Sequence, residues 1–241
     1  MRIALWGLRG GAGTSSLAAL LGDALSQLGE TVVLVDLNSA DLLRLHFNIA
    51  YDDAHGWASA KEAGRNWYEP AYQVKENLFV LPYGRHGVDA GALQRAVRVP
   101  DEQFWVQAGA SLAAQYPWVI FDLPAGGECF ASLRAQCELD IVVAPVDMAS
   151  HILLSQCRLT EHTRILVNGH DPARRLGNDI LLDWRQAYRD RLVPVAVRQD
   201  ENIHEALAYK MPATTYFPDG AGTHDAISLA TWCIAQRGAG Q

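Results

Sequence analysis

A glycine-rich stretch near the start of the 241-residue chain constrains its fold most. Residues 7–16 read Gly-Leu-Arg-Gly-Gly-Ala-Gly-Thr-Ser-Ser, after the apolar run 3–6 and before a helical pattern. Glycine lets several backbone N–H groups turn toward one point, and the N-terminus of the following helix adds partial positive charge. Such a concave loop suits the phosphate groups of a nucleotide. We therefore predict nucleotide binding by Gly10, Gly11, Ala12, Gly13, Thr14, Ser15 and Ser16.

The loop departs from the usual pattern G-x-x-x-x-G-K-[ST] at two positions. Leu8 stands at the first glycine, and Thr14 stands at the lysine that normally contacts the phosphates. Ser15 keeps the hydroxyl that is expected to bind Mg²⁺. The sequence therefore predicts a chain that holds a nucleotide but lacks a group that normally helps to hydrolyse it.

Length and composition limit the other classes of function. A chain of 241 residues with 49% hydrophobic residues can form one α/β domain over residues 1–241. Its net charge of −7 and scattered Arg residues argue against a nucleic-acid partner. There is no run of 18 apolar residues, no secretory signal and no C-x-x-C pair. We therefore expect a cytoplasmic protein without direct membrane insertion.

Short apolar runs alternate with helical patterns along the chain, which predicts a doubly wound, mostly parallel α/β sheet. Ligands bind such sheets at the carboxyl ends of the strands. The predicted strands are 2–7, 31–36, 77–82, 117–122, 139–145, 163–168 and 193–198. Helices are predicted at about 17–28, after Pro100-Asp101, and near 128–137, 150–158, 177–189, 202–210 and 223–236.

Aspartates end two of the predicted strands, at Asp36 and Asp122. A carboxylate at the end of a buried strand is costly unless it meets a cation or hydrogen-bond donors. Carboxylates and hydroxyls are suitable ligands for Mg²⁺, often through bound water. We predict a Mg²⁺ site formed by Ser15, Asp36 and Asp122; alternatively, each aspartate only caps the loop that follows it.

Three motifs resemble those of the MinD/ParA group of deviant-Walker P-loop ATPases, which have the SIMIBI type of P-loop NTPase fold. That group shows K-G-G-x-G-K-[ST], D-x-D and D-x-P/A-G, which match residues 9–16, 36–38 and 122–126. Within the group, the chain most resembles the family of the cellulose biosynthesis protein BcsQ. The weaker strings that carry this closer resemblance are the R-G-G-x-G-T loop and residues 38–48, 56–58, 81–84, 198–201 and 230–233.

The resemblance implies roles for individual residues. In the group, the lysine at the position of Arg9 reaches across a homodimer to the phosphates of the partner's ATP, which a guanidinium can also grip. Asn38 stands where the group has the carboxylate that positions the attacking water. Asn168 matches an asparagine that contacts adenine, and Arg198, Gln199 and Asp200 would cover the base. Residues 168–171 also resemble a degraded guanine motif, and we favour ATP over GTP.

The resemblance implies an ATP-dimerised regulatory or assembly component of a bacterial cellulose synthesis and secretion system, with ATP and Mg²⁺ as cofactors. It implies slow or absent hydrolysis and recruitment by partner proteins to the inner membrane or cell pole. The alternative is an active ATPase that cycles a partner. An iron–sulfur reductase is disfavoured, because a four-thiolate cluster shared by two subunits needs a second cysteine ligand besides Cys129 from each. Residues 37–128 contain no cysteine that could serve as this ligand. Trp57 and Trp67 could lie in the core or form a partner surface.

Overall fold

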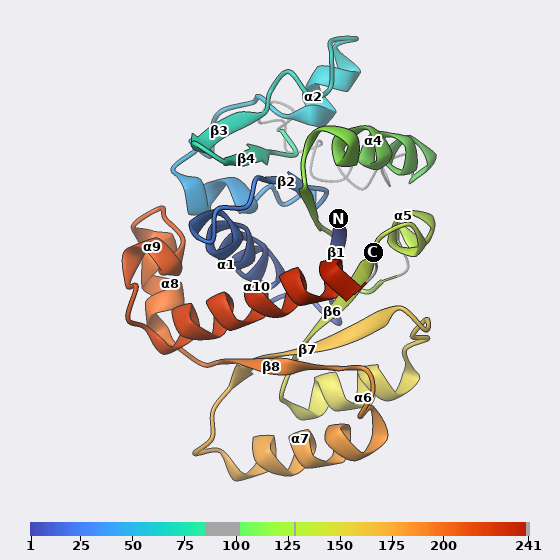
Figure 1. Ribbon diagram of the computed structural model, residues 1–241, viewed down its shortest axis with the longest axis vertical. Coiled ribbons are helices and arrows are strands. Elements are labelled where there is room, and N and C mark those ends of the chain that lie inside the picture. Colours follow the sequence, from blue (N-terminus) through green and yellow to red (C-terminus); the bar gives the residue numbers. More distant parts are fainter. Residues whose placement is uncertain (85–101, 128, 240–241) are drawn as a thin grey trace.

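The computed structural model describes residues 1–84, 102–127 and 129–239, and within them all strands join one eight-stranded sheet (Figure 1). The strand order is β3-β4-β2-β5-β1-β6-β7-β8. β1 lies near the centre, so the chain winds outward from it on both sides. The strands span Arg2–Gly7 (β1), Val32–Asp36 (β2), Tyr72–Lys75 (β3), Leu78–Leu81 (β4), Trp118–Asp122 (β5), Leu139–Pro145 (β6), Thr163–His170 (β7) and Leu192–Arg198 (β8).

The pairing is parallel throughout except that β3 runs antiparallel to β4. The predicted mostly parallel, doubly wound sheet is therefore confirmed, and all seven predicted strands are present with ends shifted by two residues at most. β3 was not predicted. Its sequence, Tyr-Gln-Val-Lys, is short and half polar, and it lies at the sheet edge, so it lacks the apolar run of a buried strand.

Helices cover both faces of the sheet, and alternate strand residues pack against each layer. Ile3 and Leu5 of β1 belong to one core cluster, whereas Ala4 and Trp6 belong to the other. The first layer contains Thr14–Gln27 (α1), Leu43–Phe47 (η1, a 3₁₀ helix), Glu201–Ala208 (α8), Ala213–Tyr216 (α9) and Ala221–Ala239 (α10). The second contains Trp57–Glu62 (α2), Glu102–Gln115 (α4), Ala131–Ala135 (α5), Met148–Gln156 (α6) and Arg175–Ala187 (α7).

The predicted helices are present, with differences in length. The helix expected near 128–137 is the short α5, and α10 continues to Ala239, beyond the predicted end at 236. The start expected at Pro100-Asp101 lies outside the described residues. The helices η1, α2 and α9 were not predicted, because segments of four to six residues are too short to show helical periodicity.

Trp57 belongs to the core and does not form a partner surface. Its side chain is buried, and its ring makes edge contacts with Tyr83 and Trp105, each at 4.8 Å between centroids. Its indole N–H donates to the carbonyl oxygen of Asp36 at 2.7 Å. Trp67 is partly buried and packs edge-on against Trp105 at 5.5 Å. These contacts attach α2 to the carboxyl end of β2.

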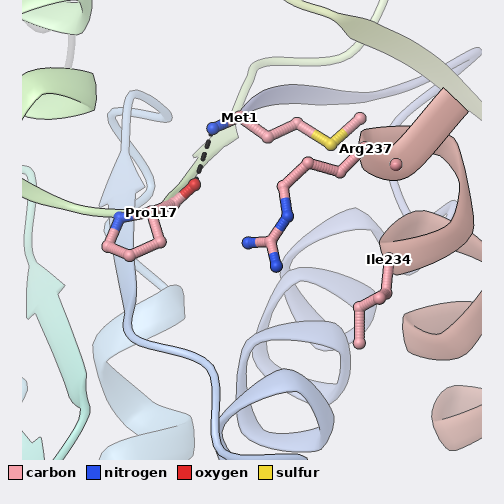
Figure 2. A pocket seen from close by; sticks show the side chains of 5 residues that line it. Met1, Pro117, Ile234 and Arg237 are labelled. Atoms are coloured by element: carbon pink, nitrogen blue, oxygen red, sulfur yellow. Dashed lines mark hydrogen bonds between the residues drawn. The ribbon is translucent and has the colours of Figure 1, made fainter. Parts of the chain in front are cut away.

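A cavity of about 500 Å³ lies at the amino ends of β1 and β5, away from the strand ends that carry the predicted site. Figure 2 shows its lining: the terminal ammonium of Met1 donates to the carbonyl oxygen of Pro117 at 2.6 Å, and Arg237 and Ile234 of α10 form the other side. The guanidinium of Arg237 pairs with Glu30, which fixes the end of α10. This cavity contains no predicted site residue.

The last helix, α10, buries Leu229, Ala230 and Cys233 in the core between α1 and β8. This burial agrees with the apolar pattern of the segment. Among the described helices, none combines the length and the apolar character needed to cross a membrane.

Candidate nucleotide-binding site

The glycine-rich loop connects β1 to α1 and is tightly folded. Its backbone begins with the Leu8 N–H donating to the carbonyl oxygen of Val143 at 3.2 Å. Gly11 and Gly13 adopt φ values of +75° and +86°, a left-handed region that residues with a Cβ rarely adopt. A Cβ on Gly7 would lie 2.8 Å from the Thr14 hydroxyl oxygen. The glycines therefore permit the close turn that the sequence predicts.

The N-terminus of α1 supplies the positive end of this loop. The helix begins at Thr14, and the preceding Gly13 has no side chain that could cap it. No acidic residue occupies the first turn. The N–H groups of the first turn, including those of Ser15 and Ser16, therefore keep the partial positive charge of a helix start. Gly10 and Gly11 are exposed, whereas Ala12 is buried beneath the loop.

Asp36 and Asp122 lie side by side at the carboxyl ends of two adjacent strands. The parallel register of β2 and β5 places them directly opposite one another, and both are fully buried. Asp36 accepts hydrogen bonds from the backbone N–H groups of Asn38 at 2.9 Å and Leu43 at 3.2 Å. Neither carboxylate oxygen of Asp122 has a hydrogen-bond partner among the described residues. The two groups form a buried acidic pair.

Burial raises the pKa of both carboxyl groups. For Asp122 the pKa rises to about 7, and the nearby Ser15 hydroxyl only partly opposes the rise. For Asp36 burial is again the main cause, and the charge of Asp122 raises the pKa further. A buried carboxylate without a partner is unfavourable, so a cation would stabilise the ionised pair.

These residues fit a magnesium ion. Two orphaned carboxylate oxygens and a serine hydroxyl are the hard oxygen donors that Mg²⁺ prefers, and they lie at the loop predicted to hold phosphates. Ser15, Asp36 and Asp122 would hold the ion here. The structure thus brings the three predicted ligands together, and their role in metal binding stays a prediction.

Arg9 is held against its own chain. Its guanidinium pairs with the carboxylate of Asp147 and donates to the Gly10 carbonyl oxygen at 3.3 Å. Asp147 also caps α6, where it accepts from the Ser150 N–H at 2.8 Å. Both side chains of the pair are 39% exposed, so the contact can exchange with solvent or with another partner. The sequence analysis did not single out Asp147, although an aspartate just before a helix is a recognisable cap.

Asn38 lies at the rim of the acidic pair. Its amide oxygen accepts from the Ala40 N–H at 3.1 Å, which closes the turn that leaves β2. A neutral amide has no charge with which to accept a proton from water. The group at this position can therefore shape the loop but cannot act as a base.

A cavity of about 90 Å³ lies on the other side of the loop and gathers the residues predicted to contact the base. The Asn168 amide donates to the Ala12 carbonyl oxygen at 2.8 Å, which attaches the end of β7 to the phosphate loop. The lining includes Gly13, Ser16, Asn168, Arg198, Gln199 and Asp200.

Two of these lining residues already have structural partners. Arg198 pairs with Asp225 at 2.8 Å. Asp200 caps α8 and also accepts from the Gly222 N–H at 2.8 Å. Gln199 is exposed. Among the described residues, its recorded hydrogen bond is that of its backbone N–H, which donates to the carbonyl oxygen of His170. The structure thus places all four residues predicted to contact or cover the base around one cavity. Among them, Asn168 and Gln199 have the side chains best placed to contact a base.

The sequence analysis missed His46. It lies in η1, and its Nε2 approaches the Ser16 hydroxyl at 3.5 Å. Burial lowers the pKa of His46 to about 4, so the ring is neutral at physiological pH. No motif marks this histidine in the sequence, because its position depends on how the segment after β2 folds back onto α1.

Comparison with known proteins adds independent findings. The family model of the cellulose biosynthesis protein BcsQ matches residues 1–234. BcsQ of Salmonella typhimurium is 32% identical over 238 residues, which cover 96% of this chain and 93% of that protein. BcsQ of Escherichia coli K12 is 31% identical over 235 residues, with the same coverage of 96% and 93%.

Solved structures with the same fold include members of the MinD/ParA group. MinD of Aquifex aeolicus superposes with a TM-score of 0.77 at 15% identity and covers 97% of this chain and 96% of its own. The septum site-determining protein MinD of Pyrococcus horikoshii, solved with Mg-ADP, gives a TM-score of 0.71 at 22% identity, with coverage of 95% and 93%. The predicted P-loop NTPase fold is therefore confirmed.

Proposed function

Because this chain belongs to the BcsQ family of cellulose biosynthesis proteins, we propose that it is an ATP-binding switch in a bacterial cellulose synthesis and secretion system. The switch binds ATP with Mg²⁺, dimerises when it does so, and hydrolyses the nucleotide slowly or not at all. It acts in the cytoplasm and reaches the inner membrane through partner proteins of that system.

The observation that carries the proposal is the first turn of α1. The uncapped helix start and the left-handed glycines provide donors for phosphates, which supports binding. The same turn carries Thr14 in place of a lysine, and Asn38 is a neutral amide engaged in a turn. Charge on the transferred phosphoryl group and activation of water both contribute to hydrolysis. Binding is therefore favoured over turnover.

The metal-binding residues fit the same conclusion. When bound, Mg²⁺ supplies positive charge to the phosphates. Asp36 and Asp122 provide carboxylates that are buried and close to the loop, and Ser15 provides a hydroxyl at the helix start. These side chains hold a metal–nucleotide complex without contributing a base.

The position of Arg9 supports the proposed dimerisation. In the single chain its guanidinium is paired with Asp147, half exposed and next to the phosphate loop. In a dimer with the two loops facing each other, this guanidinium can leave Asp147 and contact the phosphates bound by the other subunit. A nucleotide contacted from both subunits binds the dimer more tightly than the monomer, and therefore shifts the equilibrium toward the dimer.

Asn168 supports adenine as the base. Its amide is fixed by the Ala12 carbonyl, which leaves its oxygen free to accept from an exocyclic amine. Arg198 and Asp200 are held by other residues and shape the cavity wall. Competition of ATP and GTP for the purified protein tests this preference directly.

The first test is to purify the protein without added nucleotide, denature it and identify what is released. About one intact ATP per chain would support the tight-binding switch. Mostly ADP would contradict slow hydrolysis and favour the active ATPase. A matched Ser15→Ala preparation controls for contaminating nucleotide, because it removes a metal ligand while keeping the loop backbone.

A further inference from the structure

A groove separates the flank of α7 from the edge strand β8, far along the sheet from the metal-binding carboxylates. Its volume is about 710 Å³. The wall formed by α7 carries Leu182 and Arg185, and Arg189 lies in the turn just after that helix. The wall formed by β8 carries Leu192, Pro194 and Ala196. In Figure 1, α7 and β8 both lie in the lower part of the molecule.

The floor of the groove is apolar and partly open. α7 buries Ile180, Leu181 and Trp184 against the sheet. Leu182, which follows Leu181 on the same helix, is 60% exposed and lines the groove. Covering Leu182 together with the apolar residues of the lining would remove apolar surface from water, which is favourable.

Two cations border this apolar floor. Arg185 and Arg189 are four residues apart, both are exposed, and neither forms an ion pair within the described residues. None of the described residues that line the groove is acidic. Several other arginines of this chain, which has a net charge of −7, meet carboxylates, as Arg2, Arg134 and Arg237 do. The charged side chains that line the groove are therefore positive, and the exposed Asp183 and Asp190 nearby in the sequence lie outside that lining.

The edge strand favours a helical occupant over an added strand. β8 is the last strand of the sheet, so its outer edge could in principle pair with an extended peptide. Pro194, exposed in the middle of β8, has no N–H to donate and interrupts such pairing. A helix needs no backbone bonds to its partner and presents apolar side chains every three or four residues.

We propose that this groove docks an acidic amphipathic helix of a partner protein. The apolar face of that helix covers Leu182 and the floor between α7 and β8. Its carboxylates pair with Arg185 and Arg189, which fixes the register and direction of docking. The proposal rests on the groove alone and does not depend on nucleotide binding.

The test uses the full chain and a synthetic amphipathic helical peptide with leucines on one face and glutamates beside them. Fluorescence anisotropy of the labelled peptide measures binding, and hydrogen exchange locates it. We expect binding that weakens with salt and protects α7 and β8 from exchange. The variant R185E/R189E should bind at least about tenfold more weakly. R175E is the matched control, because Arg175 is on the same helix but outside the groove.

A charge exchange separates a specific contact from a damaged fold. A peptide with lysines in place of the glutamates should bind R185E/R189E better than the unmodified protein. The proposal is overturned if the glutamate peptide binds no better than a glutamine version, or if R185E/R189E binds it as well as the unmodified protein does. Binding to vesicles of anionic phospholipid that is lost in R185E/R189E, without peptide binding, would also overturn it and assign the groove to a membrane. The nucleotide content of the same samples reports separately on the proposed switch.

Discussion

At the scale of single residues, the candidate site combines a glycine-rich loop with two neutral side chains at positions where charged ones are usual. Thr14 begins α1 where a lysine would place a charge among the phosphates, and Asn38 closes a turn where a carboxylate would face water. Both side chains are polar and small enough to fit without disturbing the loop. Relative to the usual lysine and carboxylate, Thr14 and Asn38 therefore remove charge from the site but leave the shape of the loop unchanged.

Restoring these charges should raise hydrolysis. We expect T14K/N38D to increase the rate of ATP turnover at least about tenfold, because lysine stabilises the transferred phosphoryl group and aspartate can orient water. Steady-state phosphate release at saturating Mg-ATP measures the effect. T14S/N38Q, which changes size but not charge, is the matched control. An unchanged rate in T14K/N38D would show that the defect lies elsewhere.

The pair formed by Arg9 and Asp147 makes a second prediction. Removing the guanidinium in R9A should weaken ATP-dependent dimerisation about tenfold or more, the size expected of a charged hydrogen bond. D147N keeps an oxygen to cap α6 but releases Arg9, and should lower the ATP concentration needed for dimerisation. Sedimentation velocity across an ATP titration measures both. D179N, which weakens an exposed ion pair on α7, should behave like the unmodified protein.

The sequence predicted the site residues where local chain geometry determines their position. The loop 10–16 depends on its own glycines, and Asp36 and Asp122 are placed by adjacent parallel strands. Asp147 and His46 were missed for the opposite reason. Their contacts with Arg9 and Ser16 join segments that are 138 and 30 residues apart, and no spacing rule encodes those contacts.

At the scale of elements, the segment after β2 is docked by backbone packing against the end of β4. A Cβ on Gly56, just before α2, would lie 2.1 Å from the backbone nitrogen of Gly84. The carboxylate of Asp41 accepts from the N–H groups of Tyr83 and Gly84 at 3.0 and 3.2 Å. Because the backbones at Gly56 and Gly84 are in direct contact, there is no room for a side chain at Gly56.

This contact predicts that G56A destabilises the protein. The added methyl group must displace backbone atoms, and we expect a loss of about 3 kcal/mol in the free energy of unfolding. Urea denaturation followed by circular dichroism measures it. G238A is the control: no atom lies within 4 Å of its added Cβ in α10, and the free energy of unfolding should rise slightly. Equal stabilities for the two variants would contradict the close contact.

The elements themselves were predictable in proportion to their length and burial. Long apolar strands and the helices α1 and α10 show clear patterns, because each buries one face or both in the core. The segment 37–71 carries only short helices, and it is ordered by contacts such as those of Arg44. Its guanidinium is fully buried and donates to the carbonyl oxygens of Ala50 and His55 at 2.9 and 2.7 Å. Such contacts have no period along the chain.

At the scale of the whole molecule, a buried neutral histidine makes stability depend on pH. Burial lowers the pKa of His46 to about 4 in the folded protein, whereas the unfolded chain keeps the ordinary value near 6.5. Between these values the unfolded state binds more protons, so acid favours unfolding. Above about pH 6.5 both states are neutral, and the contribution no longer changes.

We expect the free energy of unfolding to fall as the pH decreases from 6.5 to 4, with His46 contributing about 2–3 kcal/mol of the loss. H46Q, which keeps a polar group near Ser16 but does not titrate, should show a shallower decrease. Urea midpoints at several pH values measure the slope. H162Q changes an exposed histidine and should retain the slope of the unmodified protein. Parallel slopes for H46Q and H162Q would argue against this role.

The contact between Trp57 and Asp36 gives the protein a built-in optical reporter. The Trp57 indole donates to the carbonyl oxygen of Asp36, an aspartate proposed to bind the metal. Its ring stands at 86° to that of Trp105, with centroids 4.8 Å apart. Two indoles in fixed orientation couple their electronic transitions and give a strong near-ultraviolet circular dichroism band. A shift at the end of β2 alters this coupling, so loading of the site can be followed in the unlabelled protein by light absorption alone.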